Sequence, residues 1–154
     1  DQKRVILAAS GVVLATGGVG GLYANTTNPL GSTGAGVALA ARAGARLRDM
    51  EFVQFHPTAI AAGRDPMPLA SEAVRGEGAI LINDRGHRFM ATIPGAELAP
   101  RDVVARAIAR EIAAGHSVFL DASAALGSRF ATRFPSVAAS CRDAGVDRPL
   151  AFDE

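Results

Sequence analysis

A long stretch without charged side chains opens this sequence: no Asp, Glu, Lys or Arg occurs between Arg4 and Arg42. Its apolar part, residues 5–24, is about as long as the roughly 20 residues that span a bilayer. Glycines interrupt it and leave two short β-branched runs, residues 5–7 and 12–14. Short apolar runs bounded by glycine are typical of buried parallel strands. We therefore expect neither a membrane span nor a cleaved signal peptide.

Two strands are predicted in this stretch, at residues 4–9 and 12–15, the second covered on both faces. A glycine-rich exit, Thr16-Gly17-Gly18-Val19-Gly20-Gly21, follows the second strand. Glycines there allow the backbone to come close to a ligand or to another segment. The spacing does not match the GxGxxG dinucleotide motif. The exit alone is consistent with a cofactor contact or with tight packing.

Composition excludes several classes of protein. At 154 residues and 49% hydrophobic, the chain is long enough for one domain with a core. Its net charge of +1, with acids and bases interspersed, gives no basic stripe for nucleic acid. The single cysteine, Cys141, forms no internal disulfide and is interpreted as a small core residue in a reducing compartment. The three histidines, His56, His87 and His116, are too scattered for a zinc site, so no metal site is predicted.

Periodicity and turn residues predict the remaining elements. In the first half they are a turn at residues 25–29, a helix at 34–43 capped by Ser32 or Thr33 and ended by Gly44, and a helix at 69–75 stopped by Gly76. A hairpin of strands 79–83 and 87–90 follows, and then a helix from Pro100 to Gly115 and a strand at 118–121. The chain is predicted to finish with a helical tail at 126–144, ended by Gly145, and a loose polar end at 147–154. The hairpin residues His87 and Arg88 are predicted to lie on a solvated strand face.

The chain changes character near residue 51, where charges become regular, and a second module is predicted to begin there. His56 is followed by Pro57, which restricts the backbone of the residue before it and so directs the imidazole. Further polar candidates follow at Ser71, Glu72, Arg75 and Arg101.

These side chains have the composition of a dicarboxylate site, because the planar fork of arginine donates two parallel hydrogen bonds to a carboxylate. Arg101 lies in the first turn of a predicted helix, where the helix dipole disfavours a cation. Departures from local rules are expected at functional sites. The alternative is that Glu72, Arg75 and Arg101 form an ordinary structural ion-pair network, and residue types do not decide between the two.

Five motifs carry a resemblance over residues 12–121. In order, they are ATGGVGGLY, TTNPLGSTGAG, EFVQFHPTAI, SEAVRGEGAIL and ELAPRDVVARAI. They resemble the flavoprotein family that contains succinate dehydrogenase, fumarate reductase and L-aspartate oxidase, and TTNP, EFVQFHPTA and ELAPRD are most similar to its L-aspartate oxidase branch.

The resemblance implies an α+β fold and a fragment that is inactive alone. Residues 1–50 would be the end of the first segment of the α/β FAD-binding domain, and residues 51–154 the capping domain that closes over the substrate. It also implies roles for individual residues. His56 and Ser71 would bind substrate carboxylates, Arg101 would bind substrate and transfer a proton, Glu72 and Arg75 would tune Arg101 or relay to it, and the main chain of Thr16, Gly17 and Gly18 would contact FAD.

Two positions depart from the family pattern. Ser71 stands where relatives commonly have threonine, which keeps the hydroxyl group. Ala35 stands where relatives commonly have an acid that contacts the flavin, so no FAD contact is expected from that side chain.

The implied parent is a cytoplasmic enzyme without a membrane partner. It would oxidise L-aspartate to iminosuccinate with FAD, pass electrons to oxygen or fumarate, and hand iminosuccinate to quinolinate synthase in NAD biosynthesis. Two alternatives stay open: a fumarate reductase or succinate dehydrogenase flavoprotein subunit, and a non-catalytic module that binds dicarboxylates.

Overall fold

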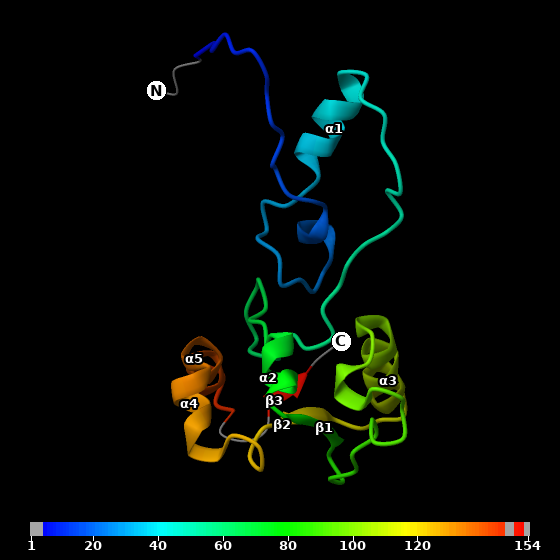
Figure 1. The fold of residues 1–154 in the computed structure, drawn as a ribbon, viewed down its shortest axis with the longest axis vertical. Coiled ribbons are helices and arrows are strands. Elements are labelled where there is room, and N and C mark those ends of the chain that lie inside the picture. The colour runs from blue at the N-terminus through cyan, green and yellow to red at the C-terminus, as the bar shows by residue number, and fades with distance from the viewer. Residues whose placement is uncertain (1–4, 147–149, 153–154) are drawn as a thin grey trace.

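The computed structural model describes residues 5–146 and 150–152. Its helices are α1 (Ala35–Arg42), α2 (Glu72–Gly76), α3 (Arg101–Ala113), α4 (Phe130–Arg133) and α5 (Pro135–Asp143), its 3-10 turns are η1 (Gly20–Leu22), η2 (Ala96–Leu98) and η3 (Gly127–Arg129), and its strands are β1 (Ile80–Asn83), β2 (Val118–Asp121) and β3 (Leu150–Phe152). Figure 1 shows two parts, with α1 and the N-terminal segment in the upper part and the sheet in the lower part. Helices and strands are thus mixed, as the sequence predicts.

The sheet is antiparallel, in the order β1-β2-β3. Ile80 pairs with Asp121 and Asn83 with Val118, so β1 and β2 match over their full lengths. Burial alternates along both strands, because successive side chains point to opposite faces. The strand predicted at 118–121 is confirmed, and the one predicted at 79–83 is confirmed from residue 80.

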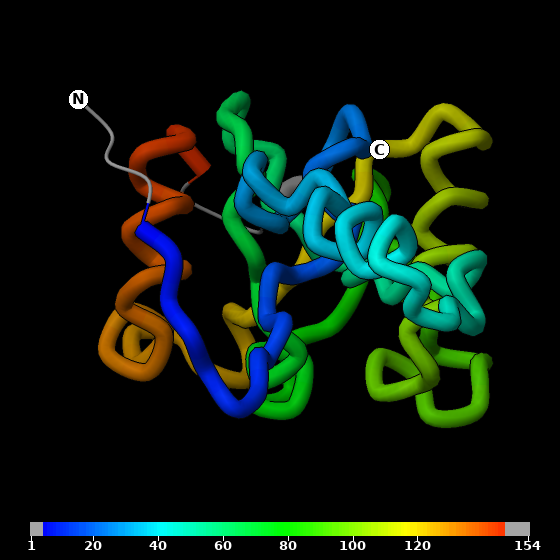
Figure 2. The backbone as a smooth tube through the Cα atoms, turned by 90° about the horizontal axis from the view of Figure 1, so that it is seen from above, coloured from blue at the N-terminus to red at the C-terminus, as the bar shows by residue number. Residues whose placement is uncertain are grey.

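The core forms around this sheet. Leu81, Val118 and Leu120 are almost completely buried and belong to one cluster with residues of the surrounding helices. That cluster includes Val74 of α2, Val104 and Ile108 of α3, and Val137 and Cys141 of α5. In Figures 1 and 2, α3 lies on one side of the sheet and α4 and α5 on the other. The prediction of Cys141 as a core residue is confirmed.

The strands predicted in the charge-free stretch are absent from residues 5–15, and Arg4 lies outside the described residues. These residues are extended but unpaired, and Ile6 and Val13 are 97% and 89% exposed. The prediction failed because a strand requires a neighbour for its backbone groups, and no such neighbour lies beside this segment in the part of the chain described here.

Helix α1 confirms the helix predicted at 34–43, and Gly44 follows its C-cap with a φ of +87°. The predicted caps, Ser32 and Thr33, are wrong. The N-cap is Gly34, in the left-handed region, and no side chain caps the helix. The Gly34 amide instead donates to the Gly18 carbonyl at 3.0 Å, which joins the helix to the glycine-rich exit.

The predicted hairpin is wrong in its second half. Residues 87–90 form no strand, because the Asn83 side chain closes the turn. Its Oδ1 accepts from the amides of Arg85 and His87, and the Asn83 amide donates to the His87 carbonyl at 3.0 Å. The partner of β1 is β2 instead.

The other helices also differ from prediction at their ends. The helix predicted at 69–75 is confirmed only as the shorter α2, which begins after Ser71 and includes Gly76. Helix α3 confirms the helix that begins at Pro100, which is its N-cap. The predicted helical tail forms three elements, η3, α4 and α5. Phe134, with a φ of −130° and a ψ of 64°, separates α4 from α5, because the residue before a proline is disfavoured in the helical conformation.

The loose C-terminal tail is also wrong in part. Leu150–Phe152 form β3 and pair with β2, whereas residues 147–149 and 153–154 lie outside the described residues.

A two-stranded strap, residues 58–70, connects the lower part to the upper one. The Ile60 amide donates to the Pro68 carbonyl, and Ala59 forms an isolated bridge with Leu69. Near the tip, the Met67 amide donates to the carbonyl of Thr26 at 2.8 Å. The predicted turn at residues 25–29 is confirmed, since the Thr26 hydroxyl accepts from the Asn28 amide. The strap therefore joins the two parts at this turn.

No helix among the described residues has the length and apolar character needed to span a bilayer.

Helix α1 packs so closely on Thr16 that a side chain at Gly36 has no space. A Cβ there would lie 1.7 Å from Thr16 Oγ1 and 2.6 Å from Thr16 Cβ. We expect Gly36→Ala to lower the free energy of unfolding by about 1–3 kcal/mol, the usual cost of overpacking. The control is Gly31→Ala, whose Cβ would meet nothing within 4 Å. Urea unfolding measures both, and equal effects would contradict this packing.

Candidate active site

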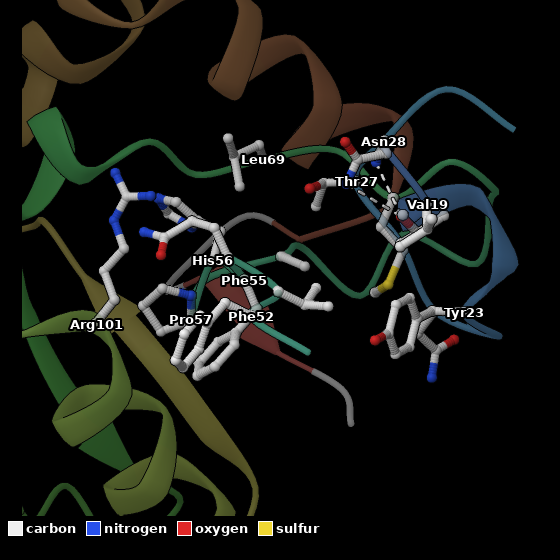
Figure 3. A pocket seen from close by; sticks show the side chains of 17 residues that line it. Val19, Tyr23, Thr27, Asn28, Phe52, Phe55, His56, Pro57, Leu69 and Arg101 are labelled. Carbon is white, nitrogen blue, oxygen red and sulfur yellow. Dashed lines mark hydrogen bonds between the residues drawn. The ribbon is translucent and has the colours of Figure 1, made fainter. Parts of the chain in front are cut away.

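A cleft of about 610 Å³ opens between the two parts of the molecule. Its lining residues come from the glycine-rich exit and the turn that follows it, from the EFVQFHPT segment, from the strap (Ala59, Met67 and Leu69), and from Arg101 at the start of α3. Figure 3 shows His56 and Arg101 at one end, Tyr23 and Val19 at the other, and Phe52 and Phe55 between them. One end of the cleft is thus polar and basic, the middle has an aromatic wall, and Thr27 and Asn28 add polar side chains at the end near Val19.

His56 is held by residue 58. The Thr58 amide donates to His56 Nδ1 at 3.3 Å, and the Thr58 hydroxyl oxygen lies 3.2 Å from the same nitrogen. Burial, together with the charges of Arg101 and Arg75, lowers the pKa of His56 to about 4, against an opposing effect of Glu72. The imidazole is therefore neutral at neutral pH.

Three of the predicted residues form a chain of ion pairs. Arg101 Nε donates to Glu72 Oε2 at 3.1 Å, and Arg75 Nη2 lies 4.0 Å from the same oxygen. Helix α2 supplies Glu72 and Arg75, and the first turn of α3 supplies Arg101. Because Arg101 and Glu72 are about half exposed, their pair contributes little to stability. Its effect is to aim the Arg101 guanidinium, which lines the cleft.

Arg75 is buried, with a side chain 1% exposed. Its Nη1 donates to the Glu97 carbonyl, whereas Nε and Nη2 have no hydrogen-bond partner among the described residues. Burial lowers the pKa of Arg75, and the charge of Glu72 opposes this effect. Buried charge is costly unless it is paired. Among the described residues, the Glu97 carbonyl and the Glu72 carboxylate offset the charge of Arg75.

The sequence interpretation missed Glu97, which completes this arrangement. Its carboxylate accepts two bonds from Arg88, at 2.9 and 2.6 Å, and one from the Leu81 amide. Burial alone would raise the pKa of Glu97, but the hydrogen bonds from Arg88 and from main-chain amides outweigh it and lower the pKa. His87 and Arg88 are exposed, as predicted, but residues 87–90 form no strand, and Arg88 pairs with a buried carboxylate. The sequence signal for this carboxylate was the presence of two acids, Glu97 and Asp102, in the motif ELAPRD.

The remaining predicted site residues lie near the cleft without lining it. Ser71 occupies the N-cap position of α2 but makes no capping hydrogen bond. Thr16, Gly17 and Gly18 immediately precede Val19, which lines the cleft. Their predicted roles in binding substrate and FAD stay predictions.

The aromatic wall was also missed. Phe52, Phe55 and Tyr23 are 76%, 51% and 53% exposed, although large apolar side chains are usually buried. The available signal was the presence of two phenylalanines beside His56 in EFVQFH.

Comparison with known proteins places this geometry in a family. A sequence profile described as "FAD binding domain" matches residues 1–153. The chain belongs to this family of FAD-binding domains. The match crosses residue 50 without a break, so the division into an FAD-binding remnant and a capping domain stays a prediction.

Curated relatives of high identity share one name. The chain is 67% identical over 142 residues to an L-aspartate oxidase of Agrobacterium fabrum, covering 92% of this chain and 27% of that protein. It is 60% identical to an L-aspartate oxidase of Caulobacter vibrioides, covering 96% and 29%. The chain thus spans between a quarter and a third of the length of these relatives.

Solved structures agree with the fold. A quinol–fumarate reductase determined with menaquinol molecules superposes with a TM-score of 0.77 at 31% identity, over 90% of this chain and 28% of that one. A mutant of Escherichia coli quinol fumarate reductase gives a TM-score of 0.69 at 33% identity, over 89% and 27%.

The cleft has the shape and polarity that FAD requires. A flat, largely apolar ring system needs an extended apolar surface beside a few polar groups, and the wall formed by Phe52, Phe55 and Tyr23 offers one beside His56 and Arg101. Its volume lies within the range of ordinary small-molecule sites, roughly 300–1,000 Å³. The residues present therefore fit the cofactor of the family.

The low pKa of His56 makes stability depend on pH. The unfolded chain binds a proton at the ordinary histidine pKa, near 6.5, whereas the folded chain does so only near 4. We expect the free energy of unfolding to fall as pH decreases from about 6.5 to 4. His56→Gln should remove this part of the slope. Urea unfolding at several pH values measures it, and parallel curves for the two proteins would contradict the low pKa.

Proposed function

We propose that this chain is part of an L-aspartate oxidase, an FAD-dependent enzyme that oxidises L-aspartate to iminosuccinate. The observation that carries the proposal is the polar end of the cleft, where a neutral imidazole and a paired guanidinium lie beside an apolar wall of suitable size. The relatives named L-aspartate oxidase, at 60% identity or more, support the choice of substrate.

In this proposal the chain's own residues bind and orient the substrate. Arg101 binds one carboxylate through its fork, which Glu72 orients at 3.1 Å. His56 and the Ser71 hydroxyl donate hydrogen bonds to a carboxylate, and the buried charge of Arg75 adds to the positive potential. Two fixed carboxylates leave the substrate one orientation, which lowers the entropy cost of reaching the reactive geometry.

The cofactor is bound by the apolar wall and, as predicted, by the main chain of Thr16–Gly18. FAD supplies the two-electron oxidation when bound. Arg101 transfers a proton to or from the substrate. Glu72 and Arg75 orient the Arg101 guanidinium and tune its affinity for the proton. Closure of residues 51–154 over the cleft excludes water from the substrate.

The whole enzyme is cytoplasmic in this proposal. It uses oxygen or fumarate as electron acceptor and passes iminosuccinate to quinolinate synthase at the start of NAD biosynthesis. These statements extend the names of the relatives to this chain.

A fumarate reductase flavoprotein is the second candidate, because the structural neighbours of 31% and 33% identity are quinol–fumarate reductases. The same arginine and histidine would bind succinate or fumarate, which differ from aspartate by the amino group. Substrate preference separates the two candidates.

The test uses the longer protein that contains this chain, purified with FAD, in assays of L-aspartate-dependent peroxide formation and of succinate oxidation. Arg101→Ala should lower kcat/KM for L-aspartate at least about a hundredfold, because it removes both a carboxylate contact and a proton-transfer group. The matched control is Arg106→Ala on the same helix, whose guanidinium pairs with Asp102 and does not line the cleft. It should change kcat/KM by less than about twofold.

Other results would revise the proposal. Turnover of succinate without turnover of aspartate would favour the fumarate reductase candidate. Bound dicarboxylate without any turnover would favour a binding module. An unchanged kcat/KM in Arg101→Ala would show that the cleft takes no part in the reaction.

A further inference from the structure

Thr58 lies between the two halves of the candidate site and is completely buried. Its hydroxyl donates to the Ala70 carbonyl at 2.7 Å, and the Ala70 amide donates to the Thr58 carbonyl at 3.0 Å. Ala70, also completely buried, is followed by Ser71, the N-cap of α2. Two hydrogen bonds therefore fix the distance between the His56 segment and the helix that carries Glu72 and Arg75.

The same residue determines which nitrogen of His56 carries the proton. A main-chain amide can only donate, so Nδ1, which lies 3.3 Å from the Thr58 amide nitrogen, must present its lone pair. The Thr58 hydroxyl has a single proton, and its shorter contact is with the Ala70 carbonyl. In the neutral ring the proton is then on Nε2.

We propose that Thr58 is a positioning residue for the substrate site, which fixes His56 as the neutral Nε2–H tautomer and keeps it in register with α2. The proposal rests on the proposed function in one respect, that a substrate carboxylate accepts the Nε2–H bond. The tautomer itself requires no substrate.

The surrounding charges agree with this role. A second proton would have to enter at Nδ1, directly opposite the Thr58 amide, and the cations of Arg101 and Arg75 oppose it as well, whereas Glu72 favours it. His56 is therefore a neutral donor and no acid. Proton transfer in the cleft must use a different group, and Arg101 is the cation that lines it.

The test measures the tautomer directly, by nitrogen-15 NMR of histidine-labelled, full-length, FAD-loaded protein, with His56→Gln identifying the His56 signals. At pH 7 we expect a protonated Nε2 and an unprotonated Nδ1 in the wild type and in Thr58→Ser. Thr58→Val retains the main-chain amide that faces Nδ1, so it should keep this tautomer, but it removes the hydroxyl bond to the Ala70 carbonyl, which should loosen the register of His56 with α2. A protonated Nδ1 in the wild type would overturn the assignment of the tautomer, and an unchanged KM in Thr58→Val would overturn the positioning role.

Kinetics supply the second readout. Thr58→Val should raise KM for L-aspartate about tenfold, the loss expected for one misaligned hydrogen bond to a charged group, with kcat changed less than about threefold. Thr58→Ser keeps the hydroxyl group, so its KM should stay within about twofold of the wild-type value.

The control for simple destabilisation is Val137→Ala, which shortens a core side chain on α5. An equal rise in KM in Val137→Ala would show that stability causes the effect and would overturn the positioning role. If the protein does not oxidise aspartate, the proposed function fails, and the NMR result still decides the tautomer.

Discussion

The burial of one guanidinium, that of Arg75, is the constraint on which the polar end of the cleft depends. A buried cation has to be surrounded by acceptors and negative charge. Arg75 has the Glu97 carbonyl on one side and the Glu72 carboxylate on the other. Glu97 in turn is held by Arg88 and by the first strand, and Glu72 directs Arg101. The network is therefore structural, and under the proposed function the same residues also serve the substrate, so the two interpretations that the residue types left open are compatible.

This network also explains the electrostatic character of the cleft. Positive charge gathers at one end, and the nearby imidazole remains neutral because it is partly buried among those cations. A site of this kind attracts a dianion without needing a charged histidine. The aromatic wall beside it suits an apolar ring.

Sequence reasoning predicted several local elements because short motifs specify local geometry. The start of α3 at Pro100, the end of α1 at Gly44 and the strand at 118–121 follow from local rules, and they placed Arg101 and its neighbours correctly.

Predictions failed where distant residues decide the structure. The Asn83 turn replaced a predicted strand, and β3 pairs with a strand almost thirty residues earlier in the chain. Residues 5–15 form no strand because pairing depends on neighbours that no local pattern reveals. Thr58 and Glu97 were within the quoted motifs, but only three-dimensional contacts show what they bind.

The strap between residues 58 and 70 has a consequence for motion. Its Met67 amide joins the lower part to the turn at Thr26 across the mouth of the cleft. An opening that broke this one bond and no apolar contact would cost about 0.5–1.5 kcal/mol. At that cost, roughly one molecule in ten would be open at any moment. Ligand entry would then be limited by how often the strap releases, and a tightly bound ligand would leave only during such intervals.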